Sequence, residues 1–189
     1  MSYYRDQLEA YLKTLDVKTP NCLDIGGSQL PIKKRVRSWD VKEYKILDLQ
    51  IPHKGEKPDI IYDLNSMSVS SEKPNQWHTV FCLEVMEYIY NSLRAIQNIR
   101  YFTKMDGILY ITFPFVYPHH NPRKEDYLRY TEWGVIKLMR MSSFKIEDII
   151  YRYGRGNNLV NFYTSEGMRA SKDYAKHNAI GFIIKAKAI

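Results

Sequence analysis

Acidic residues and a pair of glycines at the ends of short apolar runs are the residues best suited to chemistry in this sequence. Asp24 stands in the apolar run 21–25, which leads directly into Gly26 and Gly27. A second apolar run ends in Asp48. Glycines let a backbone approach a ligand closely, a following helix N-terminus offers free N–H groups, and the second acid can accept hydrogen bonds from a ribose diol. This order predicts a nucleotide-binding strand–loop–helix–strand unit, for which an ordinary turn is the alternative.

Two further strand-like runs also end in acids, Asp63 in one and Glu84 in the other. Ligands of an open parallel sheet bind beyond the carboxyl ends of its strands, so we expect these acids to share one edge with Asp24 and Asp48. Asp48 suits a ribose, and Asp63 could accept a hydrogen bond from an adenine amine. A carboxylate at Asp24 would repel a dinucleotide pyrophosphate and attract a sulfonium with an α-amino group.

The loop expected at 115–130 holds the candidates for catalysis, which are Tyr117, His120 and Arg129. His120 is the first choice for a general base or substrate ligand because histidine titrates near neutral pH, and packing within the loop is the alternative. Arg129 could hold an anionic substrate or form an internal ion pair with Asp126, and we favour the ion pair. No Cys–His spacing indicates a metal site.

The elements that would position these residues follow from apolar periodicity. Helices are predicted at 3–15, 91–105 and 131–141, with a short one after 158. Strands are predicted at 21–25, 44–49, 59–64, 77–83, 107–114, 144–153 and 179–186. Strands that alternate with helices predict an α/β fold with a doubly wound, mostly parallel sheet, helices on both faces and an antiparallel strand at an edge.

Composition limits the class of protein. At 189 residues and 22.4 kDa, the chain is expected to form one domain. Its net charge of +7, with a basic cluster at Lys33–Arg37, favours anionic partners such as nucleic acid.

Cys22 and Cys82 both lie in apolar runs, which favours a reducing, cytoplasmic compartment. No apolar segment approaches membrane-spanning length, and residues 1–6 do not resemble a signal peptide. The sequence leaves the oligomeric state open, including a homodimer.

In the order of these motifs the sequence resembles the class I S-adenosylmethionine-dependent methyltransferases, in particular their type 11-like branch. The resemblance covers roughly residues 20–150 and rests on Leu23–Gly27, Ile46–Leu49, Tyr62–Asn65, Val80–Ile89 and the Phe113-Pro114 pair. Three positions depart from the pattern of the branch: Ser28 replaces a frequent glycine, Tyr88 replaces a frequent histidine, and Trp77-His78 replaces a usual Phe-Asp.

The resemblance implies a single Rossmann-like methyltransferase domain over 1–189, with a seven-stranded sheet. Residues 1–18 would hold an N-terminal helix, 20–114 the cofactor-binding half and 115–189 the substrate-side half. The implied cofactor is S-adenosylmethionine, bound along one edge of the sheet. Its implied contacts are Asp24, Gly26 and Gly27 at the methionine part, Asp48 and Leu49 at the ribose side, Asp63 and Leu64 near the adenine, and Leu83 and Glu84 from the fourth strand.

The activity implied is methyl transfer to an oxygen or nitrogen of a small-molecule or sugar-like acceptor. The basic charge keeps a nucleic-acid methyltransferase as an alternative, although the Asn/Asp-Pro-Pro-aromatic tetrad typical of enzymes that methylate base amines is absent. A catalytically degenerate partner subunit with the same fold is a second alternative. A nicotinamide-dependent oxidoreductase is disfavoured because Gly-x-Gly-x-x-Gly does not occur.

Overall fold

A computed structural model describes residues 2–50, 57–68, 72–119, 121, 123–155, 158–167 and 178–189. Seven strands form one sheet in the order β3-β2-β1-β4-β5-β7-β6. The strands are β1 Asp16–Ile25, β2 Ser38–Asp48, β3 Ile60–Ile61, β4 Trp77–Cys82, β5 Thr103–Pro114, β6 Phe144–Tyr153 and β7 Ala179–Ala188. The helices are α1 Tyr3–Leu12, α2 Ser92–Phe102, α3 Glu132–Met141 and α4 Asn158–Ser165, with 3-10 turns η1 Ile32–Lys34, η2 Met86–Tyr88 and η3 Arg123–Glu125.

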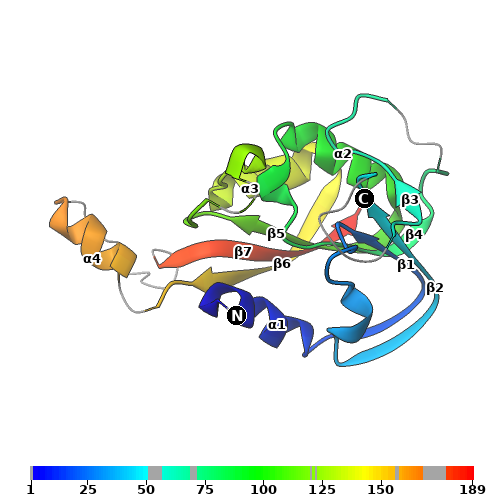
Figure 1. The fold of residues 1–189 in the computed structure, drawn as a ribbon, viewed down its shortest axis with the longest axis horizontal. Helices are drawn as coiled ribbons and strands as arrows, with labels where there is room; N and C mark the ends of the chain where they lie inside the picture. The colour runs from blue at the N-terminus through cyan, green and yellow to red at the C-terminus, as the bar shows by residue number, and fades with distance from the viewer. Residues whose placement is uncertain are drawn as a thin grey trace.

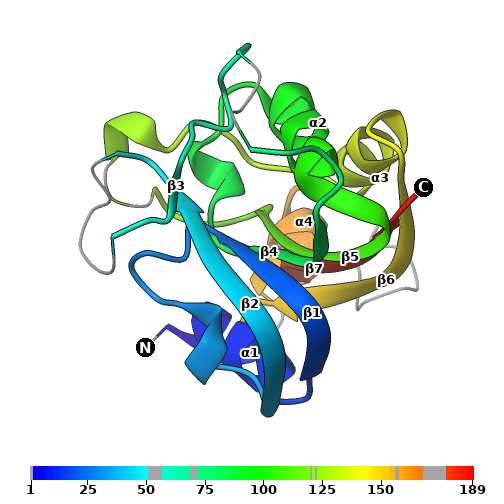
Figure 2. The ribbon, with the colours of Figure 1, turned by 90° about the vertical axis from the view of Figure 1, so that its right-hand side faces the viewer.

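The sheet is mostly parallel and is covered on both faces. Strands β1 to β5 pair in parallel, whereas β7 runs antiparallel to β5 and to β6, so an antiparallel pair forms one edge. Helices α2 and α3 lie on one face and α1 on the other, while α4 projects beyond the end of the sheet (Figures 1 and 2). These observations confirm the predicted fold class.

Helices α1, α2 and α3 each turn one apolar stripe toward the sheet. In α2 the stripe contains Ala95, Ile96 and Ile99, which join the core between the sheet and α2 and α3. In α1 it contains Leu8 and Leu12, which pack in a second core on the opposite face. Side chains of Ser2, Asn91 and Thr131 cap the N-termini of α1, α2 and α3, as such residues do when they satisfy free backbone N–H groups.

The structure corrects one local prediction that bears on the site. No α-helix follows Gly26-Gly27; the chain forms a turn and then the single 3-10 turn η1 before β2 begins at Ser38. Pro31 and the basic residues after it leave too short an apolar stretch for an amphipathic helix. Backbone N–H groups at this edge are therefore supplied by the loop itself and not by a helix terminus.

The other differences concern the ends of elements. Strands β1 and β2 begin earlier than predicted, and β3 is shorter than predicted. Helix α2 ends at Phe102 because Thr103 is already extended, with φ −74° and ψ 127°, so β5 follows without a loop. Among the described residues, none of the helices has the length and apolar character needed to cross a membrane.

Candidate functional site

The loop after β1 is built around two glycines that no other residue could replace without rearrangement. Gly26 has a φ of +74°, and its N–H donates to the carbonyl of Leu47 at 2.8 Å. A Cβ on Gly26 would lie 2.4 Å from Cγ2 of Val85. A Cβ on Gly27 would lie 2.4 Å from Cγ of Asp24. The backbone therefore closes tightly against Val85 and Asp24, over the ends of β1 and β4.

The buried side chain of Asp24 supports this loop from the protein interior. The residue is 3% exposed, and its Oδ2 accepts hydrogen bonds from Ile32 N and from the Tyr44 hydroxyl, each at 2.7 Å. Burial raises the pKa of the carboxyl to about 6, although these two hydrogen bonds oppose the shift. The side chain predicted to face the methionine part of a cofactor thus also fixes the path of residues 26–32.

Asp48 occupies the rim of the same loop. Its Oδ2 accepts from Ser28 N at 3.3 Å and its Oδ1 from Leu49 N at 2.8 Å. Asp48 is partly exposed, and Leu49 beside it is 50% exposed. Each carboxylate oxygen has a second lone pair, so the geometry leaves Asp48 able to accept from a diol. Ser28, which departs from the glycine pattern of the resemblance, is fully buried and contributes its backbone N–H here.

The next strand end has a local turn of its own. Oδ1 of Asp63 accepts from Asn65 N at 2.9 Å and from its side-chain amide at 3.1 Å, as in an Asx turn, and Asp63 is exposed. Leu64 is buried at 3% exposure. The side-chain Oδ1 of Asn65 in turn accepts from Tyr90 N and Asn91 N, which ties this turn to the start of α2.

The end of β4 contains an ion pair that sequence reasoning missed. Leu83 is buried, and Glu84 has a φ of +57° with its N–H donating to the Thr112 hydroxyl at 2.7 Å. The Glu84 carboxylate pairs with the fully buried guanidinium of Arg152 at 2.6 and 3.3 Å. Burial alone would raise the pKa of Glu84, but Arg152 holds it below its usual value.

Arg152 also anchors the N-terminal helix to this edge. Its guanidinium lies 3.2 Å from the ring centroid of Tyr4 and donates to the Tyr4 carbonyl at 2.9 and 3.2 Å. Gln7 adds a reciprocal pair of hydrogen bonds to the backbone of Tyr153, at 2.8 and 2.9 Å. The signal available in the sequence was an arginine within the otherwise apolar and aromatic end of β6.

The three predicted catalytic residues receive different placements. Arg129 forms a bidentate ion pair with Asp126 at 2.5 and 2.6 Å and donates to the Tyr117 carbonyl at 3.2 Å. The Tyr117 ring packs on Tyr4, with centroids 4.6 Å apart. His120 lies outside the described residues. The Arg129–Asp126 pair therefore holds the loop 115–130 together, and a role for these three residues in catalysis stays a prediction.

Glu87 is a second residue that the sequence analysis did not select. It lies in η2, directly after the Glu84 turn, and is 6% exposed. Its Oε2 is buried without a hydrogen-bond partner in the described part of the chain. Burial first, and then the negative charge of Glu84, raise the pKa of Glu87 to about 8.

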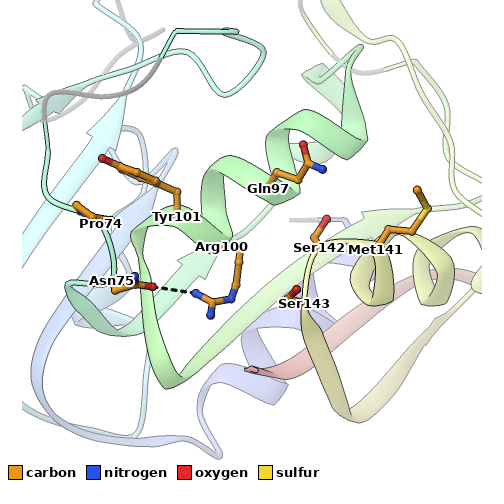
Figure 3. Close-up of a pocket in the computed structure, with 8 residues that line it drawn as sticks. All are labelled: Pro74, Asn75, Gln97, Arg100, Tyr101, Met141, Ser142 and Ser143. Carbon is orange, nitrogen blue, oxygen red and sulfur yellow. Dashed lines mark hydrogen bonds between the residues drawn. The ribbon is translucent and has the colours of Figure 1, made fainter.

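These contacts bring the glycine loop, Asp48 and the segment after β4 together at the carboxyl edge of the parallel strands. The open cavity in Figure 3, about 440 Å³, lies at the opposite edge, between the C-terminal ends of α2 and α3. Arg100 lines that cavity and donates to Asn75 at 3.0 Å, and it contains none of the predicted site residues. No group of three or more metal-ligating side chains occurs among the described residues.

Comparisons with known proteins identify the fold. No known family profile and no curated protein matches the sequence. Solved structures do match: an S-adenosylmethionine-dependent methyltransferase from Mesorhizobium loti has a TM-score of 0.62 at 11% identity, covering 98% of both chains. A chain from the complex of the Haloferax volcanii Trm112 methyltransferase activator with a methyltransferase has a TM-score of 0.62 at 11% identity, covering 98% of this chain and 89% of that one.

A third structural neighbour has a different reaction. The [4+2]-cyclase SpnF has a TM-score of 0.60 at 15% identity and covers 98% of this chain and 80% of its own. The chain therefore has the fold of the class I S-adenosylmethionine-dependent methyltransferases. At such low identity the reaction has to be argued from the site.

Proposed function

We propose that this protein is an S-adenosylmethionine-dependent methyltransferase that acts on an oxygen or nitrogen atom of a small-molecule or sugar-like acceptor. The observation that carries the proposal is the partly exposed Asp48 carboxylate, which sits 3.3 Å from the backbone N–H of Ser28 at the rim of the glycine loop. A carboxylate that can accept hydrogen bonds from a diol, at the rim of a tight glycine loop, fits an adenosine ribose and the chain that extends from it.

The residues present fit such a cofactor. Gly26 and Gly27 let the loop close tightly at this edge, Asp48 would hold the ribose, and the half-exposed Leu49 offers an apolar contact beside it. The bound cofactor would supply an activated methyl group on a sulfonium. The protein would then orient the acceptor and exclude water, and the described part of the loop 115–130, in which Arg129 pairs with Asp126, would contribute to this.

The charge distribution favours a small acceptor over nucleic acid. Within the basic cluster Lys33–Arg37, the guanidinium of Arg35 pairs with Glu9 at 2.7 Å, and that of Arg37 pairs with Asp16. Within this cluster, Lys33 and Lys34 are then the exposed basic residues that make no ion pair in the described part of the chain. A protein surface that binds a nucleic-acid backbone usually neutralises more phosphates than two lysines can.

Replacement of Asp48 tests the proposal. Asp48→Ala removes both carboxylate oxygens and should weaken S-adenosylmethionine binding by more than about tenfold, or about 1.4 kcal/mol, in calorimetric titration. Asp40→Ala, on an exposed part of β2, is the matched control and should bind as the wild type does. Equal affinities for the wild type and Asp48→Ala would refute the ribose assignment. Transfer of a radiolabelled methyl group to a panel of phenols, amines and sugars would then identify the acceptor class.

A further inference from the structure

The segment 85–87 contacts both the glycine loop and the loop 115–130. The backbone carbonyl of Glu87 accepts from Tyr127 N at 2.8 Å and Leu128 N at 3.4 Å, so the loop 115–130 packs directly against it. Two residues earlier in the chain, Val85 fills the space that a side chain on Gly26 would need. Glu87 therefore follows, two residues along the chain, the residue that contacts the loop expected to hold the cofactor.

The charged groups around Glu87 are already paired with one another. Glu84 pairs with Arg152, and Asp126 pairs with Arg129 and also lies 3.5 Å from the exposed imidazole of His119, so both guanidiniums already have a carboxylate partner. Glu87 has no counter-ion among the described residues, and its Oε2 has no hydrogen-bond partner there. Burying such a carboxyl costs stability unless it stays protonated.

The remaining titratable groups near Glu87 do not supply a positive charge. They are the hydroxyls of Tyr4 on α1, Tyr88 in η2 and Tyr130 at the end of the loop, and the thiol of Cys82 at the end of β4. Burial and the neighbouring Glu84 raise the pKa of Glu87 to about 8, which agrees with a neutral side chain at pH 7. A bound cation would be the missing counter-charge.

We propose that Glu87 is the proton-linked carboxyl of this site: it is protonated in the protein alone, and it loses its proton to solvent when a cationic sulfonium binds at the glycine loop. The inference rests on the proposed function. Once ionised, the Glu87 carboxylate can accept the O–H or N–H proton of an acceptor. Glu87 would therefore set a preference for the charged S-adenosylmethionine over the uncharged sulfur of S-adenosylhomocysteine.

Proton release on binding tests the inference without a known acceptor. The heat of binding is measured at pH 7 in buffers with different ionisation enthalpies, such as PIPES and imidazole. S-adenosylmethionine, and sinefungin with its protonated amine, should each release roughly 0.5 proton or more beyond that released by S-adenosylhomocysteine. The difference should vanish above about pH 9, where Glu87 is already ionised.

The variant Glu87→Gln keeps the shape of the side chain and every titratable group of the ligands. It should abolish the extra proton release and lower the preference for S-adenosylmethionine, while S-adenosylhomocysteine binds within about threefold of wild type. Glu125→Gln, at an exposed position of the same region, is the matched control.

The outcomes separate this inference from the proposed function. If S-adenosylmethionine and S-adenosylhomocysteine bind with the same proton release in the wild type, the role of Glu87 is refuted while the cofactor stands. If neither ligand binds to the folded wild type, the proposed function itself fails. The wild-type comparison decides the inference even if Glu87→Gln does not fold.

Discussion

Loss of the Arg152 guanidinium should be among the most damaging single changes in the protein. Arg152 is fully buried, pairs with Glu84 at 2.6 Å and donates twice to the Tyr4 carbonyl. Arg152→Met keeps most of the side-chain length, but it leaves a buried carboxylate and a carbonyl without their donors. Removal of one partner of a buried ion pair costs about 3–5 kcal/mol. For a chain of this size that corresponds to a decrease in melting temperature of roughly 6–20 °C.

A double-mutant cycle assigns this cost to the ion pair. Urea and thermal unfolding would be followed for the wild type, Arg152→Met, Glu84→Gln and the double variant. The double variant should be more stable than Arg152→Met alone, because no unpaired charge stays buried. Arg37→Met is the control, since the Arg37–Asp16 pair is 60% and 50% exposed and should contribute less than about 1 kcal/mol.

The reasoning would be refuted by an Arg152→Met variant within about 1 kcal/mol of wild type, or by strictly additive effects of the two substitutions. Either result would mean that Glu84 finds solvent or another donor when Arg152 is gone. It would also mean that the Glu84–Arg152 ion pair does not hold β6 against the end of β4.

Three further predictions concern the two loops of the site. Gly27→Ala forces a Cβ into the fixed carboxylate of Asp24, so it should cost about 2 kcal/mol in unfolding free energy and weaken S-adenosylmethionine binding; wild-type values in both assays would contradict this. The pKa of Glu87, about 8 when folded, exceeds its ordinary value of 4.5, so the folded state holds a proton that the unfolded chain releases. Wild-type stability should therefore fall relative to Glu87→Gln by up to about 1.4 kcal/mol per pH unit between pH 5 and 8, and denaturation curves that shift in parallel would exclude this linkage. Asp126→Asn weakens the anchor of Arg129, so amide hydrogen exchange should accelerate within the described part of the loop 115–130, and unchanged exchange there would show that the loop is held by other contacts.

Elements with strong local patterns could be predicted from the sequence. The strand at 144–153 and the helix at 131–141 are found close to their predicted bounds, because alternation and capping are encoded within the elements themselves. The prediction of a helix after Gly26-Gly27 was wrong because it did not rest on such a local pattern. The glycine pair resembles a common unit, whereas residues 28–38 lack the apolar periodicity that a helix needs to pack.

The features of the site that could not be predicted depend on contacts between residues far apart in the sequence. Glu84 and Arg152 belong to different strand ends, and nothing in either local pattern indicates that they pair. That Glu87 makes no ion pair in the described part of the chain becomes clear only when the partners of Glu84 and Asp126 are known. Conversely, the types and order of Gly26, Gly27 and Asp48 were enough to predict that they meet at one edge of the sheet, because parallel strands end together.

The central claim is that the carboxyl edge of this sheet binds S-adenosylmethionine, and calorimetric titration of the wild-type protein tests it most directly. S-adenosylmethionine and S-adenosylhomocysteine should bind with dissociation constants on the order of micromolar, with a stoichiometry of about one, and NAD should not bind because its pyrophosphate would meet the negative charge of Asp48 at the rim of the loop. A folded protein that binds neither sulfur ligand, or that binds NAD more tightly, would contradict the account.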